Sequence, residues 1–164
     1  MRALAPLLGA RLIDNHSVYN VGLSLTVFKS PAFYEAVRSV RAVAGSCIAY
    51  LPPETPLIMT NAHFATSDWG SENWEAFNGF ARQRGLPLAV VVLDCSRVEN
   101  MRRIAGESRI GKGALRDPAL VPEAGQGRTL LAHGGDWTLH LDVTDLSAAQ
   151  AAAAIRDWLQ AMNR

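Results

Sequence analysis

The spacing of hydrophobic residues along the chain alternates between two patterns. Apolar residues that recur every three or four positions are typical of one face of a helix, and short apolar runs bounded by turn residues are typical of strands. Four such runs predict strands, over residues 11–14, 57–60, 88–94 and 138–143. Helical spacing fills most of the chain between them, so strands alternate with helices.

Capping signals place the longest predicted helix. Ser30 followed by Pro31 is a typical start, because serine caps free N–H groups and proline suits the first turn. Pro52 and Pro53 stop the helix, because proline removes a donor and restricts the residue before it. The residues at helical spacing between these limits are Phe33, Val37, Val40, Ala44 and Ile48.

The N-terminal stretch predicts a further short helix. Leu4, Leu7 and Leu8 fall at helical spacing, and Gly9 is a typical helix stop. The apolar run ends at Arg11 and is too short for a typical signal peptide, which favours the helix. Residues 15–29 mix polar and apolar positions without a clear period.

Three more helices follow from local signals. One comes after the turn at residues 67–71 and ends at Gly85. The other two open with capping boxes that start at Ser96 and Ser147, because Glu or Gln follows each serine by three positions. The residues that these helices are expected to bury include Trp74, Phe77, Ala81, Ile155, Leu159 and Met162.

The alternation of strands and helices predicts one α/β domain over residues 1–164, with a parallel sheet covered by helices on both faces. In such sheets ligands bind at the carboxyl ends of the strands. The polar residues expected at or near these ends are Asp14, Asn15, His16, Asn61, Asp94, Ser96 and Asp142.

Composition narrows the class of protein. Hydrophobic residues make up 49% of the chain and charged residues 19%, which is typical of a globular domain. The net charge of +1 argues against a nucleic-acid partner, and no apolar run approaches the ~20 residues that span a bilayer. Cys47 and Cys95 form no Cys-x-x-Cys pair, so both are expected to be reduced and buried, as in a cytoplasmic protein.

Several familiar motifs fail on closer reading. Residues 106–113, GESRIGKG, approach the phosphate-loop pattern, but eleven residues separate them from the preceding strand, and Gly113 replaces the hydroxyl that would hold magnesium. The dinucleotide-binding pattern G-x-G-x-x-G also fails, because Leu130 stands where its third glycine would be. The four histidines lack the spacing of zinc ligands, and no serine lies in a nucleophile elbow. We therefore predict no metal ligands.

A basic cluster has two interpretations. Arg102 and Arg103 are followed by further cations in the segment 106–127, namely Arg109, Lys112 and Arg116. They could form a solvated face, or belong to a mobile lid over residues 106–127 that brings guanidinium groups onto a transferring phosphoryl group.

Four segments together resemble small bacterial P-loop kinases of the shikimate- and gluconate-kinase-like type, which are often labelled AAA-family ATPases. These segments are LGARLIDNH, LAVVVLDCSRVENMRRI, RDPAL and TLHLDVTDLSAAQAAAAI. The resemblance implies a three-layer α/β/α, P-loop NTPase-like fold with strand order 2-3-1-4-5. It also implies ATP and Mg²⁺ as cofactors and phosphoryl transfer to a small polar molecule.

The resemblance also implies roles for particular residues. Catalytic roles fall on Asp14, Arg102, Arg103 and Arg109; nucleotide contacts fall on Asp142 and Thr144; and substrate contacts fall on Asn15, His16 and Asn61. Asn61 occupies the Walker B-like position, where an aspartate would be the stronger metal ligand.

Kinases of this type have a strand and a Walker A loop ahead of the segment that resembles RALAPLLGARLIDNH. The present chain begins inside the corresponding helix, so the central strand, between the strands at 57–60 and 88–94, is expected to be missing. We expect little or no kinase activity and low stability from this chain. Three alternatives remain open: a truncated kinase, a non-catalytic relative that binds a ligand or partner, and an unrelated flavodoxin-like or other α/β module.

Overall fold

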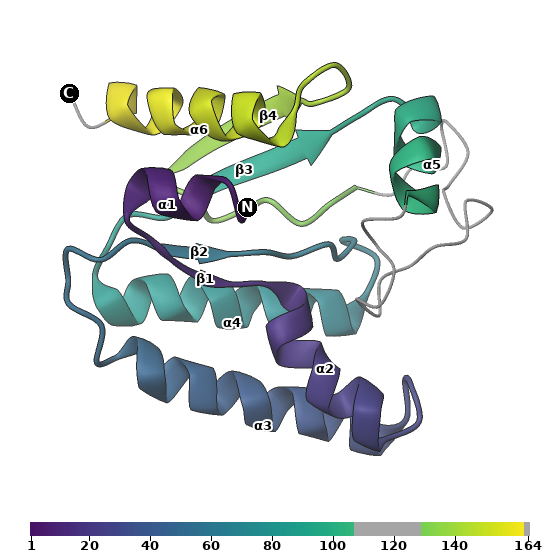
Figure 1. The fold of residues 1–164 in the computed structure, drawn as a ribbon. Coiled ribbons are helices and arrows are strands. Elements are labelled where there is room, and N and C mark those ends of the chain that lie inside the picture. Colours follow the sequence, from purple (N-terminus) through teal and green to yellow (C-terminus); the bar gives the residue numbers. More distant parts are fainter. Residues whose placement is uncertain (107–128, 163–164) are drawn as a thin grey trace.

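The computed structural model describes residues 1–106 and 129–162. Strands and helices alternate along them, as predicted (Figure 1). The strands are β1 (Arg11–Ile13), β2 (Leu57–Met59), β3 (Ala89–Asp94) and β4 (Trp137–Asp142). The helices are α1 (Leu4–Leu8), α2 (Asn15–Leu25), α3 (Pro31–Ile48), α4 (Asp68–Arg84), α5 (Arg97–Ala105) and α6 (Ala148–Met162).

The four strands form two separate parallel pairs. β1 pairs with β2, with Arg11 opposite Leu57, and β3 pairs with β4, with Ala89 opposite Trp137. Within residues 1–106 and 129–162 no ladder joins β2 to β3, so the strands do not form one continuous sheet. The two pairings agree with the predicted order, in which the strands at 11–14 and 57–60 are neighbours and so are the strands at 88–94 and 138–143.

Helices cover the strands from both sides, which confirms the layered α/β architecture. Figure 1 shows α1 and α6 beside β3 and β4, and α4 and α3 on the opposite side, below β1 and β2. Leu4 of α1 packs with Ala152 and Ile155 of α6 in a core that also contacts Ile58 of β2 and Val91 of β3. This cluster therefore touches both strand pairs.

The segment without a clear pattern forms helix α2. Asp14 caps it, because its side chain accepts a hydrogen bond from the Ser17 N–H. The helix buries only Val18 and Gly22. A Cβ on Gly22 would lie 3.0 Å from the Phe33 ring, so glycine allows α2 to approach α3 closely. Because so few positions of this helix are buried, its apolar residues show almost no helical period in the sequence.

The two predicted capping boxes are formed to different extents in the structure. At α6 the box is complete: Ser147 Oγ accepts from the Gln150 N–H, and Gln150 Oε1 accepts from the Ser147 N–H. At α5 only half is formed. Ser96 Oγ accepts from the Glu99 N–H, whereas the Ser96 N–H donates to Thr144.

Three predictions about burial are wrong. Cys47 is exposed and Cys95 is half-buried, although both are free thiols as expected. Met162 is exposed because it lies on the last turn of α6. β3 is not covered throughout: Val90 is buried, but Leu93 is 37% exposed next to the open edge of the strand pair. In the described part of the chain, no helix combines the length and hydrophobicity needed to cross a bilayer.

Candidate functional site

Asp14 lies directly after β1 and is ionised by its local contacts. Its Oδ1 accepts from both the Ser17 N–H and the Ser17 hydroxyl at 2.8 Å. These hydrogen bonds, the side-chain one first, lower the pKa of the carboxyl. Its Oδ2 lies 3.5 Å from Arg2 on the other side. The predicted catalytic carboxylate is therefore a half-buried helix cap whose second oxygen makes a long contact with Arg2.

The polar ends of β1 and β2 are joined, as the sequence predicts. The Asn15 N–H donates to Thr60 Oγ1 at 2.9 Å, and the Thr60 N–H donates to the Ile13 carbonyl. Asn61 accepts from the His63 N–H through Oδ1, while its buried Nδ2 has no partner in the described residues. Asp14, Asn15 and Asn61 therefore share one edge. His16 sits on the first turn of α2 beside them.

A half-buried aromatic relay lies behind this edge and was missed by sequence reasoning. Trp69 Nε1 donates to the Tyr19 hydroxyl at 2.8 Å, and that hydroxyl lies 2.8 Å from His63 Nε2. Because an indole only donates, the tyrosine hydrogen points to His63. Burial, and then the charge of Arg41, lower the pKa of His63, so the imidazole is neutral and suited to accept it. The partners are 44 and 50 residues apart, so no local pattern could have shown them.

The carboxyl ends of β3 and β4 form a second polar group. Asp142 Oδ1 accepts from the Thr144 N–H at 2.8 Å, and hydrogen bonds from the Thr144 side chain and backbone lower the pKa of Asp142. The Thr144 hydroxyl accepts from the Ser96 N–H. Asp142 and Thr144, predicted to contact nucleotide, therefore close the turn between β4 and α6. In the described ranges no hydrogen bond or ion pair joins this group to Asp14.

Two arginines connect α5 to that turn. Arg103 Nη2 donates to the Val143 carbonyl at 2.6 Å and more weakly to those of Thr144 and Leu146. Arg102 forms a bidentate pair with Glu99 and remains 72% exposed. Hydrogen bonds from Arg102, and then from Arg103, lower the pKa of Glu99 to about 2. Arg103 is therefore held in place, and Arg102 is the more available cation.

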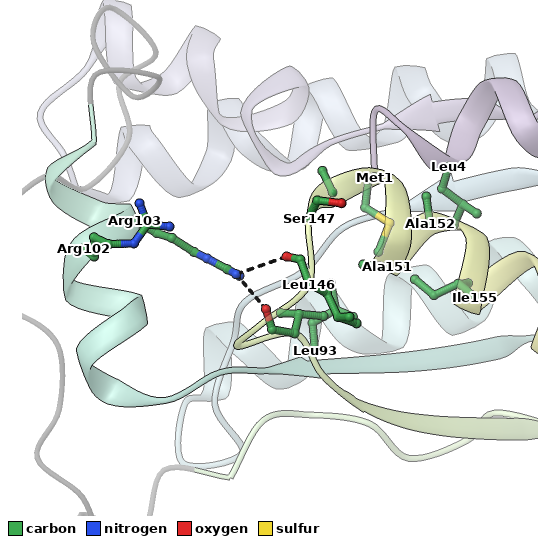
Figure 2. A pocket seen from close by; sticks show the side chains of 12 residues that line it. Met1, Leu4, Leu93, Arg102, Arg103, Leu146, Ser147, Ala151, Ala152 and Ile155 are labelled. Carbon is green, nitrogen blue, oxygen red and sulfur yellow. Dashed lines mark hydrogen bonds between the residues drawn. The ribbon is translucent and has the colours of Figure 1, made fainter.

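A cavity of about 420 Å³ opens between α1, α5 and α6. Figure 2 shows Arg103 reaching from α5 toward the loop before α6, while Leu4 approaches from α1 and Met1 from the residues just ahead of it. Leu93, Val143 and Ile155 are among its apolar lining residues. Ser147 and Ala148, at the start of α6, complete it. Such a site combines an apolar wall with cationic and helix-terminal groups, which suits an anion with a flat apolar part.

The predicted residues thus fall into two groups at the same end of the strands. Arg109 and the proposed lid, except Gly106, lie outside the described residues. No group of three His, Cys, Asp or Glu side chains in the described chain could hold a metal ion. The two asparagines and Asp14 form one group, and the cavity with its arginines forms the other.

Fold and site together define an α/β protein with its polar groups at the carboxyl ends of parallel strands. A solved structure with a similar fold belongs to a protein of Chloroflexus aurantiacus J-10-fl described as a "putative kinase", with a TM-score of 0.63. The match covers 97% of this chain and 87% of that chain, at 19% sequence identity. No family model matches the sequence, and no curated protein does either. The likeness confirms the kinase-like fold, and it does not distinguish shikimate- or gluconate-kinase-like proteins within it.

Proposed function

We propose that this chain forms the nucleotide-facing and substrate-facing parts of an ATP-dependent kinase for a small polar molecule. By itself it transfers phosphate weakly or not at all, because its described residues supply no glycine-rich loop between a strand and a helix. One preorganised donor to a developing anion contributes roughly 10²–10³ in rate, and a phosphate loop supplies several.

The cavity between α1, α5 and α6 is the observation that carries this proposal. It lies at the carboxyl ends of β3 and β4, where ligands bind in open α/β sheets. Its apolar wall suits a nucleotide base, and Arg102 suits a phosphate because its guanidinium is exposed and always charged. The fold likeness to a protein described as a "putative kinase" supports the kinase-like part of the proposal.

The other polar group suits the phosphoryl acceptor. Asp14 is ionised, and among the described residues its Oδ2 makes only the long contact with Arg2. The unpartnered Nδ2 of Asn61 is a donor that a hydroxyl or carboxylate of the substrate would satisfy. Asn15 and His16 start the helix beside them. These residues favour a polar acceptor and do not identify it.

The two implied cofactors fit the described residues to different extents. For ATP, Arg102 and the start of α6 would hold phosphate, and the apolar wall would hold the base. For Mg²⁺ the donor set of the described residues is insufficient, because Asp14 and Asp142 already accept hydrogen bonds in separate groups and neither belongs to a described cluster of three acidic, histidine or cysteine side chains. We derive no step through the metal.

A second candidate is a non-catalytic relative that binds a ligand or partner. Arg103 favours it, because its guanidinium is committed to Glu99 and to backbone carbonyls, which are structural contacts. Under this alternative the cavity binds an anionic ligand without chemistry.

Restoring a phosphate loop separates the two candidates. A strand and a G-x-x-x-x-G-K-S loop would be fused ahead of Met1, and phosphoryl transfer from MgATP to a panel of sugars and hydroxy acids would be followed by ³¹P NMR. We expect transfer to an acceptor, slowed roughly 10³-fold or more by Arg→Ala at one of positions 102, 103 or 109. Arg97→Ala, an exposed residue on the same helix, serves as the control. Absence of transfer in a folded fusion would contradict the kinase proposal. Full activity in all three variants would leave the kinase proposal standing and reduce the basic cluster to a solvated face.

A further inference from the structure

The side-chain amide of Asn61 has a defined orientation. The His63 N–H donates to Asn61 Oδ1 at 3.1 Å. Because a backbone N–H can only donate, the atom that it meets must be the oxygen, so Nδ2 lies on the other side of the amide. That nitrogen is buried and has no partner among the described residues. A buried donor without an acceptor is unusual in a folded protein, which points to a ligand atom that accepts from it.

The His63 backbone, which sets this orientation, is held from two further directions. Its carbonyl accepts from the Leu131 N–H at 3.1 Å. The start of α4 also packs closely on it, because a Cβ on Gly70 would lie 2.9 Å from the His63 Cβ. The glycine therefore allows a contact that leaves His63 little room to shift.

The His63 side chain is fixed by the aromatic relay. The Tyr19 hydroxyl lies 2.8 Å from His63 Nε2 and accepts from Trp69 Nε1, also at 2.8 Å. The guanidinium groups of Arg38 and Arg41 lie over the Trp69 ring, at 5.2 and 5.6 Å from its centroid. The relay therefore runs from α4 through α2 to the residue that orients the amide.

We infer that Tyr19 and His63 are positioning residues that hold the Asn61 amide with its nitrogen toward the phosphoryl acceptor. The inference rests on the proposed function, in which the acceptor binds beside Asp14 and Asn61. Without the relay the amide could rotate and offer Oδ1 instead of Nδ2. Asp14 already supplies an ionised oxygen there, so the rotated amide would leave the substrate with two hydrogen-bond acceptors and no donor.

The orientation can be measured without a ligand. Solvent exchange of the Asn61 Nδ2 protons would be followed by NMR in Tyr19→Phe, which removes only the hydroxyl, and in Tyr34→Phe. Tyr34 is the matched control, because its ring centroid lies 4.6 Å from that of Trp69 and its hydroxyl has no hydrogen-bond partner among the described residues. We expect exchange at least about 10-fold faster in Tyr19→Phe and unchanged in Tyr34→Phe.

A second pair of variants separates positioning from a general loss of structure. Glutamine can accept from Tyr19 through its side-chain oxygen, whereas leucine cannot. His63→Gln should therefore keep the slow exchange of the Asn61 Nδ2 protons, and His63→Leu should accelerate it as Tyr19→Phe does. The Ile58 backbone amide, which lies in the β1–β2 pair, should exchange at the same rate in all variants.

The role in acceptor binding is tested on the fusion with the restored phosphate loop. Tyr19→Phe should raise KM for the acceptor by about 10-fold and leave kcat within about two-fold, because the Asn61 contact serves binding. Unchanged Nδ2 exchange in Tyr19→Phe, fast exchange in His63→Gln, or an unchanged KM in an active fusion would overturn the inference. An inactive fusion with relay-dependent exchange would support the positioning of the amide and count against the kinase proposal alone.

Discussion

Arg103 of α5 and Val143 after β4 are joined by a 2.6 Å hydrogen bond in which the guanidinium donates to the backbone carbonyl. The same guanidinium pairs with Glu99, four residues earlier on its own helix. One side chain thus anchors α5 to the turn that leads into α6. The position of Arg102 at the cavity depends on this anchor.

Arg103→Ala should destabilise the fold. It removes hydrogen bonds from a charged group to carbonyls that are partly buried, so the free energy of unfolding should fall by about 1–3 kcal/mol. Urea unfolding at neutral pH measures the change. Arg97→Ala on the same helix should remain within about 0.5 kcal/mol of the parent. Equal stabilities of the two variants would show that the anchor contributes nothing.

Gly45 and Gly79 form a matched pair of helical glycines. A Cβ on Gly45 would lie 2.7 Å from Phe80, whereas on Gly79 the nearest atom is 4.0 Å away, at the end of Arg82. Gly45→Ala should therefore cost about 1–3 kcal/mol through overpacking. Gly79→Ala should stabilise the protein by up to about 1 kcal/mol, because alanine favours the helix. Thermal unfolding of both variants tests the close packing of α3 on α4. Stabilisation by both substitutions would contradict that packing.

Glu72 should contribute to stability only above acidic pH. Hydrogen bonds from Arg38, and also from Arg41, lower its pKa to about 2 from an ordinary value of 4.5. The unfolded chain therefore binds the proton first, so the contribution is present above about pH 4.5 and is lost as pH falls toward 2. Because the side chain is 38% exposed, solvent screens part of the effect.

Glu72→Gln should accordingly lower stability at pH 7 and reduce the difference in unfolding free energy between pH 5 and pH 3. Glu54→Gln, at an exposed position, is the control. An unchanged pH dependence in Glu72→Gln would mean that the pairs with Arg38 and Arg41 do not persist in solution.

His63 should make the protein less stable in mild acid. Burial lowers its pKa below the ordinary value of 6.5, so protons bind the unfolded state preferentially as pH falls through 6.5. Stability should decline from there down to the folded pKa, because a protonated Nε2 can no longer accept from Tyr19. An NMR titration of the His63 ring gives that pKa directly. A value at or above 6.5 would contradict the neutral histidine in the relay with Tyr19 and Trp69.

Local signals predicted much of the fold. The Ser30–Pro31 start and the complete Ser147 box lie where the sequence indicates, because caps are interactions within one turn. Helix α2 was not predictable in the same way, because its burial depends on the close approach of Gly22 to Phe33.

The candidate site divides along similar lines. The edge with Asp14 and Asn61 follows from strand ends, which the sequence marks. The Tyr19–His63–Trp69 relay depends on contacts across 44 and 50 residues, and the commitment of Arg103 to Val143 depends on a turn 40 residues away. Neither the relay nor the Arg103 contact can be recognised from the local spacing of residues. The sequence shows Arg102 and Arg103 only as two neighbouring positive charges and could not distinguish them.

Nucleotide binding by the unaltered chain tests the kinase proposal most directly. MgATP would be titrated while backbone amide shifts are recorded, with Arg102→Ala and Arg97→Ala as the paired variants. We predict saturable shifts confined to the cavity, at Leu93, Val143, Leu146 and Ala148, with a dissociation constant in the millimolar range and several-fold weaker binding in Arg102→Ala alone. Micromolar affinity, shifts that bypass the cavity, or equal binding by the two variants would contradict the account.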